Sequence, residues 1–160
     1  MDLSLSHSDE LRQGFSLHLF HHLAPMHFDR GFTGIELRRC ASAWLIQRFI
    51  DSKARFAFAP ENQVPEKSVP FDMFHESGFG HRGEDCTFET LQKEFRIRDR
   101  RVKVISEIIH DADLADEKFG RKEGYGIDEI LKGWGRQGIS DQELLDRGMQ
   151  LIEGLYHAQA

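Results

Sequence analysis

Two short stretches of this 160-residue chain gather the side chains best suited to chemistry. The first holds His81, Cys86 and Glu89 on a segment loosened by glycines. The second holds His110 and Asp113, whose spacing of three places them on one face of a helix. Imidazole and carboxylate groups together suit Mn, Fe or Zn. The pattern therefore predicts a site for one divalent metal ion with four ligands: His81, Glu89, His110 and Asp113.

The same residues also have a structural interpretation. A carboxylate in the first turn of a helix, such as Glu89, is stabilised by the helix dipole alone. A histidine at the end of a helix, such as His110, is stabilised there in its cationic form. The alternative function is therefore a non-catalytic sensor or interaction module, in which the polar residues cap helices and tie loops to the core.

Cys86 allows a third kind of chemistry. A thiol just before a helix lies where the positive helix end stabilises a thiolate, and His81 could act as its base. Glu84 and Asp85 oppose that thiolate, and a buried cysteine commonly acts as a small hydrophobic side chain. From the residues alone, a nucleophilic thiol and a buried hydrophobic side chain both remain open for Cys86.

Further residues are expected to support the ligands or to hold an anion beside them. Arginine forks suit an oxyanion. The residues assigned to these supporting roles are Arg39, Arg48, Asp72, Cys86 and Asp111. His18 and His22 are spaced as a metal-binding pair, but no acid or thiol lies near them in the sequence, and we do not assign them a metal. A metal-activated water and a redox-active centre both fit the proposed ligands, so the sequence does not select a reaction.

Helices are expected to position both stretches. Apolar spacing and capping residues predict helices from Thr87 to about Phe95 and from Asp99 to about Asp113. Other helices are expected over residues 8–23, 41–51 and 127–134, and from the capping box that begins at Ser140, with a loop at Gly120, Gly124 and Gly126.

Two segments favour strands. Alternation over residues 55–60 predicts one, and residues 69–74 are expected to return as another. The expected fold class is mainly α with a small β-sheet (α+β), with about five to six helices and two or three strands. Residues 1–33 are interpreted as an amphipathic helix and a linker, and residues 34–160 as one domain.

The bulk composition fits a soluble globular protein. Hydrophobic residues make up 39% and charged residues 30%, and the formal net charge is −6, so nucleic acid is not an expected partner. No apolar run is long enough to predict a membrane span, and the two cysteines lack CxxC spacing. We expect a cytoplasmic protein whose partner is a small inorganic ion or small molecule, with a homo-oligomer as an option.

From about Gly34 to His157 the chain resembles the C-terminal domain of the chromate-resistance protein ChrB family. The resemblance is carried by an ordered series of residues and segments: 41–46, 48–51, 69–74, 79–81, 83, 85–91, 108–114, 118–121, 141, 143–145, 148–149 and 155–156. It implies a bacterial, mainly cytoplasmic domain associated with chromate resistance, found alone or fused to other modules. Longer relatives carry a further N-terminal region and a regulatory role, and we do not expect DNA-binding regulation to transfer to this shorter, acidic chain.

Two positions depart from the pattern of that family. Arg38 stands where relatives usually have an acid ahead of the tryptophan helix. Arg82 stands where they often have a second histidine, so a histidine pair in this loop is not assumed.

Overall fold

The structure is a computed structural model and describes residues 36–56, 58 and 79–159. These residues form five α-helices and one π-helical segment, which are, in chain order, α2 (Leu37–Leu45), η1 (Ile46–Ile50), α3 (Thr87–Glu94), α4 (Arg100–Leu114), α5 (Glu123–Arg136) and α6 (Asp141–Ala158). Within the described residues, every helix is too short or too polar to cross a bilayer. The predicted helix over residues 8–23 and the predicted boundary after residue 33 lie outside the described residues.

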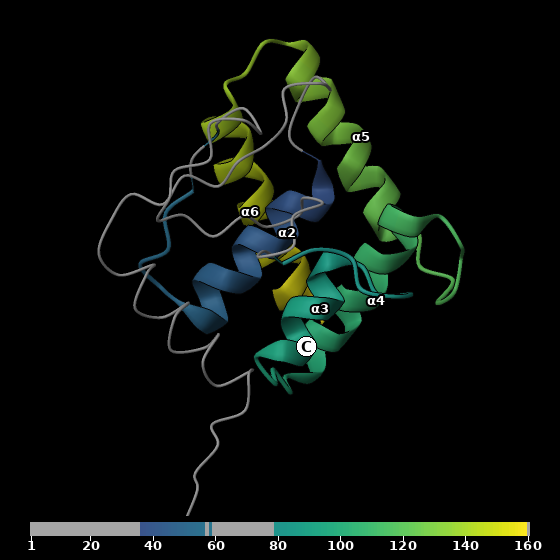
Figure 1. The fold of residues 1–160 in the computed structure, drawn as a ribbon. Helices are drawn as coiled ribbons and strands as arrows, with labels where there is room; N and C mark the ends of the chain where they lie inside the picture. Colours follow the sequence, from purple (N-terminus) through teal and green to yellow (C-terminus); the bar gives the residue numbers. More distant parts are fainter. Residues whose placement is uncertain (1–35, 57, 59–78, 160) are drawn as a thin grey trace, which may run out of the picture.

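Helix α2 is the centre of the packing. It contacts α3, α4, α5 and α6, and Figure 1 shows it between α6 and the α3–α4 pair. Most of its side chains are buried, including Cys40, Trp44 and Leu45. A Cβ atom at Gly148 of α6 would collide with Sγ of Cys40, so a glycine allows the two helices to approach this closely. The predicted helix at residues 41–51 is confirmed and begins earlier, at Leu37.

The two helices that carry the candidate site start at identifiable caps. Asp99 accepts hydrogen bonds from the backbone N–H of Arg101 and Val102, at 2.7 Å and 3.2 Å, which confirms its predicted role at the start of α4. Helix α3 begins at Thr87 with Cys86, rather than Thr87, as its N-cap. The apolar stripe predicted for α4 is buried: Val102, Ile105, Ile108 and Ile109.

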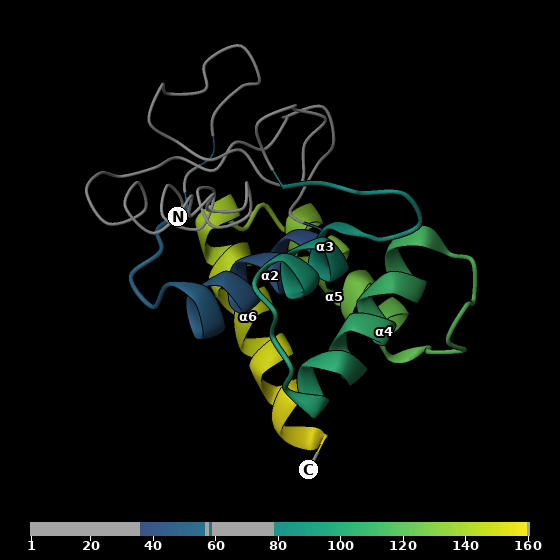
Figure 2. The ribbon, with the colours of Figure 1, turned by 60° about the horizontal axis from the view of Figure 1, so that its bottom comes forward.

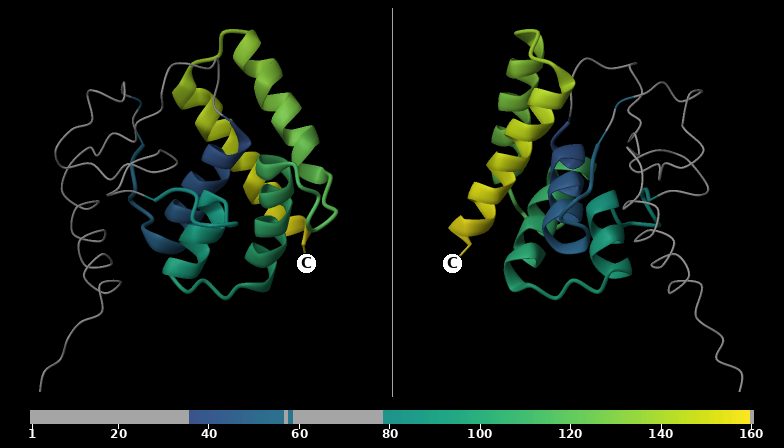
Figure 3. Two further views of the ribbon diagram at one scale, coloured as in Figure 1. Left: turned by 45° about the vertical axis from the view of Figure 1, so that its right-hand side comes forward. Right: turned by 90° about the vertical axis from the view of Figure 1, so that its left-hand side faces the viewer.

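Helices α5 and α6 form a hairpin, which Figure 3 shows from two sides. The turn between them uses Gly138 at a positive φ of 78°. The hydroxyl of Ser140 then accepts the N–H of Glu143 at 3.3 Å and starts α6, as predicted. The far end of α6 reaches the start of α4, where the Tyr156 hydroxyl donates to Oδ2 of Asp99 at 2.7 Å (Figure 2).

The predicted fold class is wrong in its β component. The part of the chain that the structure describes is helical and contains no strand, although Arg82 and Asp85 form an isolated antiparallel bridge and Phe79 is also a bridge residue. Half of the first predicted strand and all of the second lie outside the described residues. Phe56 and Phe58, which created the alternating pattern, are partly buried against the helical core. Their alternation therefore reflects packing on helices.

The predicted loop at Gly120, Gly124 and Gly126 is also only partly correct. Gly120 lies in a loop with a positive φ of 66°, whereas Gly124 and Gly126 lie inside α5. A Cβ atom on Gly124 would come within 2.7 Å of the Cβ of Ala112, so this glycine permits close contact between α4 and α5. Gly124 is therefore required by helix packing, and the loop predicted at this position is wrong.

Candidate functional site

His110 lies near the end of α4 and is fully buried, with 0% of its surface exposed. Its Nδ1 is 2.6 Å from Oε2 of Glu89, and its Nε2 is 3.1 Å from Oδ2 of Asp116. Burial lowers the pKa of His110, but the hydrogen bonds to Glu89 and Asp116 and their negative charges outweigh it, and the pKa is raised. The imidazole therefore lies between two carboxylates, with one at each nitrogen.

Glu89 is held in place by the start of its own helix. Its Oε2 accepts the backbone N–H of Cys86 at 2.9 Å, in a capping box that Cys86 and Glu89 form together. The side chain is only 10% exposed. The same carboxylate oxygen thus caps α3 and holds Nδ1 of His110, so the capping role predicted for Glu89 and its place beside His110 coexist.

Asp116 reaches His110 because the chain turns back sharply after α4. Ala115 and Glu117, on either side of it, have positive φ angles of 53° and 54°. Left-handed backbone at residues other than glycine costs on the order of 1 kcal/mol or more, so the surrounding contacts must maintain this turn.

Asp111 supplies those contacts. Its carboxylate accepts the backbone N–H of Phe119 at 3.0 Å and that of Arg121 at 2.7 Å. Its carbonyl oxygen accepts the Tyr125 hydroxyl at 2.9 Å. The edge of the Phe119 ring then packs on His110, with ring centroids 5.1 Å apart. Asp111 therefore fixes the loop that carries Asp116.

Asp116 is the side of the site that faces solvent. Its side chain is 47% exposed, in contrast to Glu89 and His110. The backbone N–H of Lys118 and then the hydrogen bond with His110 lower the pKa of Asp116. The carboxylate is therefore ionised at neutral pH and accessible from outside.

Two overlapping sets of donor atoms have the spacing of metal ligands. Each set contains one atom per residue, all within 4.8 Å of one another: Cys86 with Glu89 and His110, and His110 with Asp111 and Asp116. Two ligands with bonds of about 2.1 Å, at angles between square and tetrahedral, lie about 3.0 to 3.4 Å apart. The 3.1 Å between His110 and Asp116 matches this spacing, whereas the 2.6 Å between His110 and Glu89 is that of a short hydrogen bond.

His81 and Asp113 form a separate pair. Nε2 of His81 lies 3.0 Å from Oδ2 of Asp113, while Oδ1 of Asp113 accepts Nη1 of Arg38 at 3.3 Å. The four predicted ligands thus lie as two pairs, and no close group of three donor atoms joins these pairs among the described residues. Arg38, at the position of the missing acid, is an ion-pair partner of Asp113 and of Glu36.

Cys86 is buried beside Glu89. Burial raises the pKa of its thiol to about 12, and the negative charges of Glu89 and Asp113 contribute, although a hydrogen bond from the Glu89 backbone opposes them. A thiol that stays protonated at neutral pH is a poor nucleophile.

The predicted supporting residues are dispersed. Arg48 of η1 lies over the ring of Tyr156 at 5.0 Å and pairs with Glu153 at 3.0 Å, so its charge is used in a contact with α6. Arg39 is half-buried on α2, Asp111 holds the loop after α4, and Asp72 lies outside the described residues. Asp116 was not among the predicted ligands, although it continues the run of acids from Asp111 and Asp113 past the end of α4.

Comparisons with known proteins agree on one family. The family model described as "ChrB, C-terminal domain" matches residues 31–159. A curated relative, "Protein ChrB" of Cupriavidus metallidurans, is 32% identical over 120 residues, which are 74% of this chain and 36% of that protein. The chain thus spans about a third of the length of this relative. No solved structure matches it.

Proposed function

The chain belongs to the ChrB C-terminal domain family, and we propose that it acts in chromate resistance as a domain that binds a divalent metal ion at the end of α4. The proposed ligands are Nε2 of His110 and the carboxylate of Asp116. Asp111 lies close enough to be a third ligand, although its main contacts are to the backbone of the loop.

One observation carries this proposal. A fully buried imidazole has a carboxylate on each nitrogen, and the two distances differ. Histidines that bind metals in proteins commonly donate their other N–H to a carboxylate, which fixes the tautomer and the ring orientation. Glu89 has the position of that carboxylate, and Asp116 has the position of a second ligand on the solvent side.

The chain's own residues would prepare the site in a simple way. Glu89 keeps the proton on Nδ1, and Nε2 gives up its proton so that its lone pair points to the ion. Mixed imidazole and carboxylate ligands suit Zn, Mn or Fe. A bound ion of this kind would supply Lewis acidity or, for Mn and Fe, redox chemistry. Direct binding of an oxyanion such as chromate has less support, because the groups around His110 are carboxylates.

A purely structural function is the alternative, and specific contacts favour it. Glu89 closes the capping box of α3, and Asp111 ties the loop to α4. A doubly protonated His110 would satisfy both of its carboxylate neighbours without any metal. In that function the domain is a sensor or interaction module, and the imidazolium of His110 supplies the positive charge that pairs with Glu89 and Asp116.

Metal content distinguishes the two functions. The purified protein, His110→Gln and His157→Gln would each be stripped with chelator, incubated with Zn²⁺, Mn²⁺ or Fe²⁺, desalted and analysed for bound metal. His157 is a matched control because it also contacts a carboxylate, Glu153, at 2.9 Å but is exposed on α6. We expect wild type and His157→Gln to retain metal and His110→Gln to lose it. Equal metal in all three proteins would favour the structural function.

A further inference from the structure

The link between α3 and α4 concentrates positive charge on an acidic chain. Residues 93–104 hold six cations and two acids, whereas the formal net charge of the whole chain is −6. Four exposed cations of this segment form what we call the basic patch: Arg96, Arg98, Arg100 and Lys103. Figure 3 shows the link at one end of the described residues, opposite the turn of the α5–α6 hairpin.

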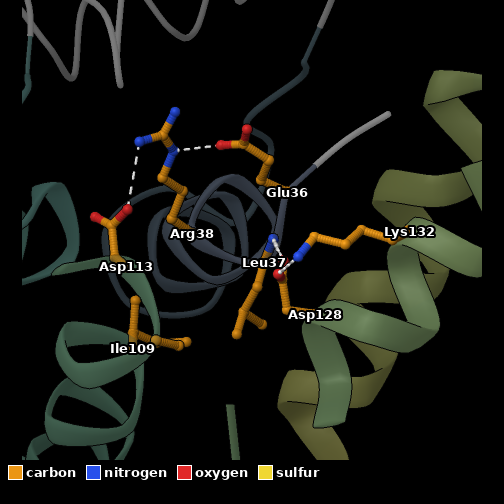
Figure 4. Close-up of a pocket in the computed structure, with 8 residues that line it drawn as sticks. Glu36, Leu37, Arg38, Ile109, Asp113, Asp128 and Lys132 are labelled. Carbon is orange, nitrogen blue, oxygen red and sulfur yellow. Dashed lines mark hydrogen bonds and ion pairs between the residues drawn. The ribbon is translucent and has the colours of Figure 1, made fainter. Parts of the chain in front are cut away.

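The cations of the basic patch have no acidic partner among the described residues. Cations elsewhere commonly have one, as Figure 4 shows for Lys132, whose Nζ lies 2.7 Å from Asp128. The two acids of the link are already engaged, since Oε2 of Glu94 lies 3.6 Å from Nη1 of Arg82 and Asp99 caps α4. The positive charge of the patch is therefore available to a partner.

Arg96 occupies a backbone position that favours glycine. Its φ angle is 51°, in the left-handed region. Its N–H donates to the carbonyl of Lys93 at 3.1 Å, and the N–H of Ile97 donates to the carbonyl of Gln92 at 3.0 Å. These two bonds form the Schellman motif that ends α3, in which the left-handed residue is most often glycine. A side chain at this position costs stability, so the packing of α3 does not explain the arginine.

Arg100 and Lys103 lie at the start of α4, where cations are also unfavourable. The positive end of the helix dipole favours acids and opposes cations in the first turn. Asp99 already accepts the N–H groups of Arg101 and Val102, so the side chains of the patch, and not the helix end itself, would hold an anion. Residues kept where they oppose local stability, with no ion pair to offset the cost, indicate a functional surface.

The spacing of the patch fits carboxylates on an extended peptide. Arg98 and Arg100 are exposed and alternate with Ile97, which packs partly on the core, and Asp99, which accepts the Tyr156 hydroxyl. Alternate residues of an extended segment lie on one side, about 7 Å apart, and alternate acids of an extended peptide have the same spacing. Arginine forks also bind carboxylates with two parallel hydrogen bonds.

Other anionic partners fit the patch less well. Among the described residues, the exposed large hydrophobic side chains are Phe119, Tyr125 and Ile130, which all lie outside the link. The patch therefore has no exposed aromatic ring to stack on bases and no apolar side chain to enter a lipid surface. A long polyanion would also approach the negative charge that the rest of the chain carries, whereas a short acidic segment would not.

We propose that the basic patch docks a carboxylate-rich segment of a partner protein, whose Asp or Glu side chains pair with Arg96, Arg98, Arg100 and Lys103. This surface is separate from the proposed metal site. Arg100 and His110 are at opposite ends of α4, which places them about 15 Å apart along the helix axis.

The test is a fluorescence anisotropy titration of labelled octaglutamate with the full-length protein at about 0.15 M salt. We expect saturable binding of octaglutamate and none of octaglutamine. The double variant Arg98→Gln/Arg100→Gln should weaken binding about fivefold or more. Lys122→Gln/Arg136→Gln, which removes two exposed cations of α5 with the same charge change, should leave it unchanged. Absence of binding, or an equal loss in the two double variants, would overturn the proposal.

Arg96→Gly separates a binding role from a structural one. Glycine suits the φ angle of 51°, so the thermal midpoint should rise while the affinity for octaglutamate falls. A lower midpoint would show that Arg96 stabilises the turn and would contradict the proposal. Duplex DNA is the second probe of the same proteins. If DNA binds more tightly than octaglutamate and Arg98→Gln/Arg100→Gln abolishes that binding, the patch takes nucleic acid and the proposal is wrong.

Discussion

The end of α4 and the region where α6 contacts α2, η1 and the start of α4, which we call the α6 junction, both place carboxylates beside buried rings, but they provide different partners for them. At the α6 junction, Glu153 accepts the indole N–H of Trp44 at 2.6 Å and pairs with Arg48. Asp99 accepts the Tyr156 hydroxyl, and the guanidinium of Arg101 lies 4.0 Å from the centre of the Tyr156 ring. Each carboxylate there has a neutral donor and a nearby arginine.

The carboxylates around His110, at the end of α4, have different partners. Glu89 and Asp116 share one imidazole, that of His110. Asp111 is held by backbone N–H groups. The pKa of His110 is raised because the ring binds its proton more tightly between these two acids. The comparison teaches that a carboxylate beside a ring does not by itself mark a functional site. The proposed metal site rests instead on two carboxylates that share one buried imidazole.

Removal of the Trp44 side chain should give the largest effect on stability. Trp44 is buried and packs on Phe49 and Tyr156, so Trp44→Ala should lower the free energy of unfolding by about 3 to 5 kcal/mol. Urea unfolding followed by circular dichroism measures this. Trp134→Ala, at a half-buried position, should lower the free energy of unfolding by a smaller amount. The folded fraction of Trp44→Ala should bind metal with wild-type affinity, and a matching loss of affinity would mean that the two regions are not independent.

Asp111→Asn should weaken metal binding although the two main ligands, His110 and Asp116, are unchanged. The loop that carries Asp116 depends on hydrogen bonds to Asp111, and loss of such supporting contacts typically weakens metal binding about 10- to 100-fold. Titration calorimetry with Zn²⁺ measures the change. Asp113→Asn, on the same helix, should weaken binding less than Asp111→Asn. The reverse order would assign the metal to the pair of His81 and Asp113.

The affinity for the metal should rise with pH. A proton must leave Nε2 of His110 before the metal binds, and the pKa of this ring is raised above the usual value of about 6.5. Below that pKa, the affinity should increase about tenfold per pH unit. Titrations of wild type and His157→Gln between pH 6 and pH 8 should show the same slope, and a flat profile would exclude a ring nitrogen as ligand.

The smallest expected effect tests the α6 junction. Tyr156→Phe removes the hydroxyl that donates to Asp99 and should cost about 1 kcal/mol at neutral pH. Burial acts to raise the pKa of Asp99, but the Tyr156 hydroxyl, two backbone N–H groups and Arg101 lower it overall. This stabilisation is therefore present above the usual aspartate pKa of about 3.9 and is lost as the pH falls below it. Urea unfolding of both proteins at several pH values should show their difference shrink in acid, and a constant difference would contradict the assignment.

The sequence predicted those parts of the fold that depend on local signals. Asp99 and Ser140 start helices because each cap and its apolar stripe lie within a few residues. The loop predicted at Gly124 was wrong because the glycine is needed for contact with Ala112, which belongs to another helix and is not apparent from the local sequence. The strand prediction at Phe56 and Phe58 was wrong because two alternate side chains can pack on a helical core as well as on a sheet.

The candidate site was predictable to a similar degree. His110 and Glu89 could be selected from residue type and position beside helix ends, and their contact follows from the packing of α3 on α4. Asp116 could not, because its approach to His110 depends on left-handed backbone at Ala115 and Glu117, which their residue types do not favour. The partner of Asp113 also depends on tertiary structure, since His81 reaches it from the glycine-rich segment before α3.

The most direct test of the central claim is an NMR measurement on the ring nitrogens of His110. Long-range ¹H–¹⁵N spectra of histidine-labelled protein, with His110 assigned from His110→Gln, report the protonation of Nδ1 and Nε2 separately. In metal-free protein at pH 6 both nitrogens should be protonated. After addition of Zn²⁺, Nε2 should lose its proton and shift to a metal-bound value while Nδ1 keeps its proton on Glu89. If both ring nitrogens of His110 keep their metal-free chemical shifts at saturating Zn²⁺, the proposed metal site is contradicted.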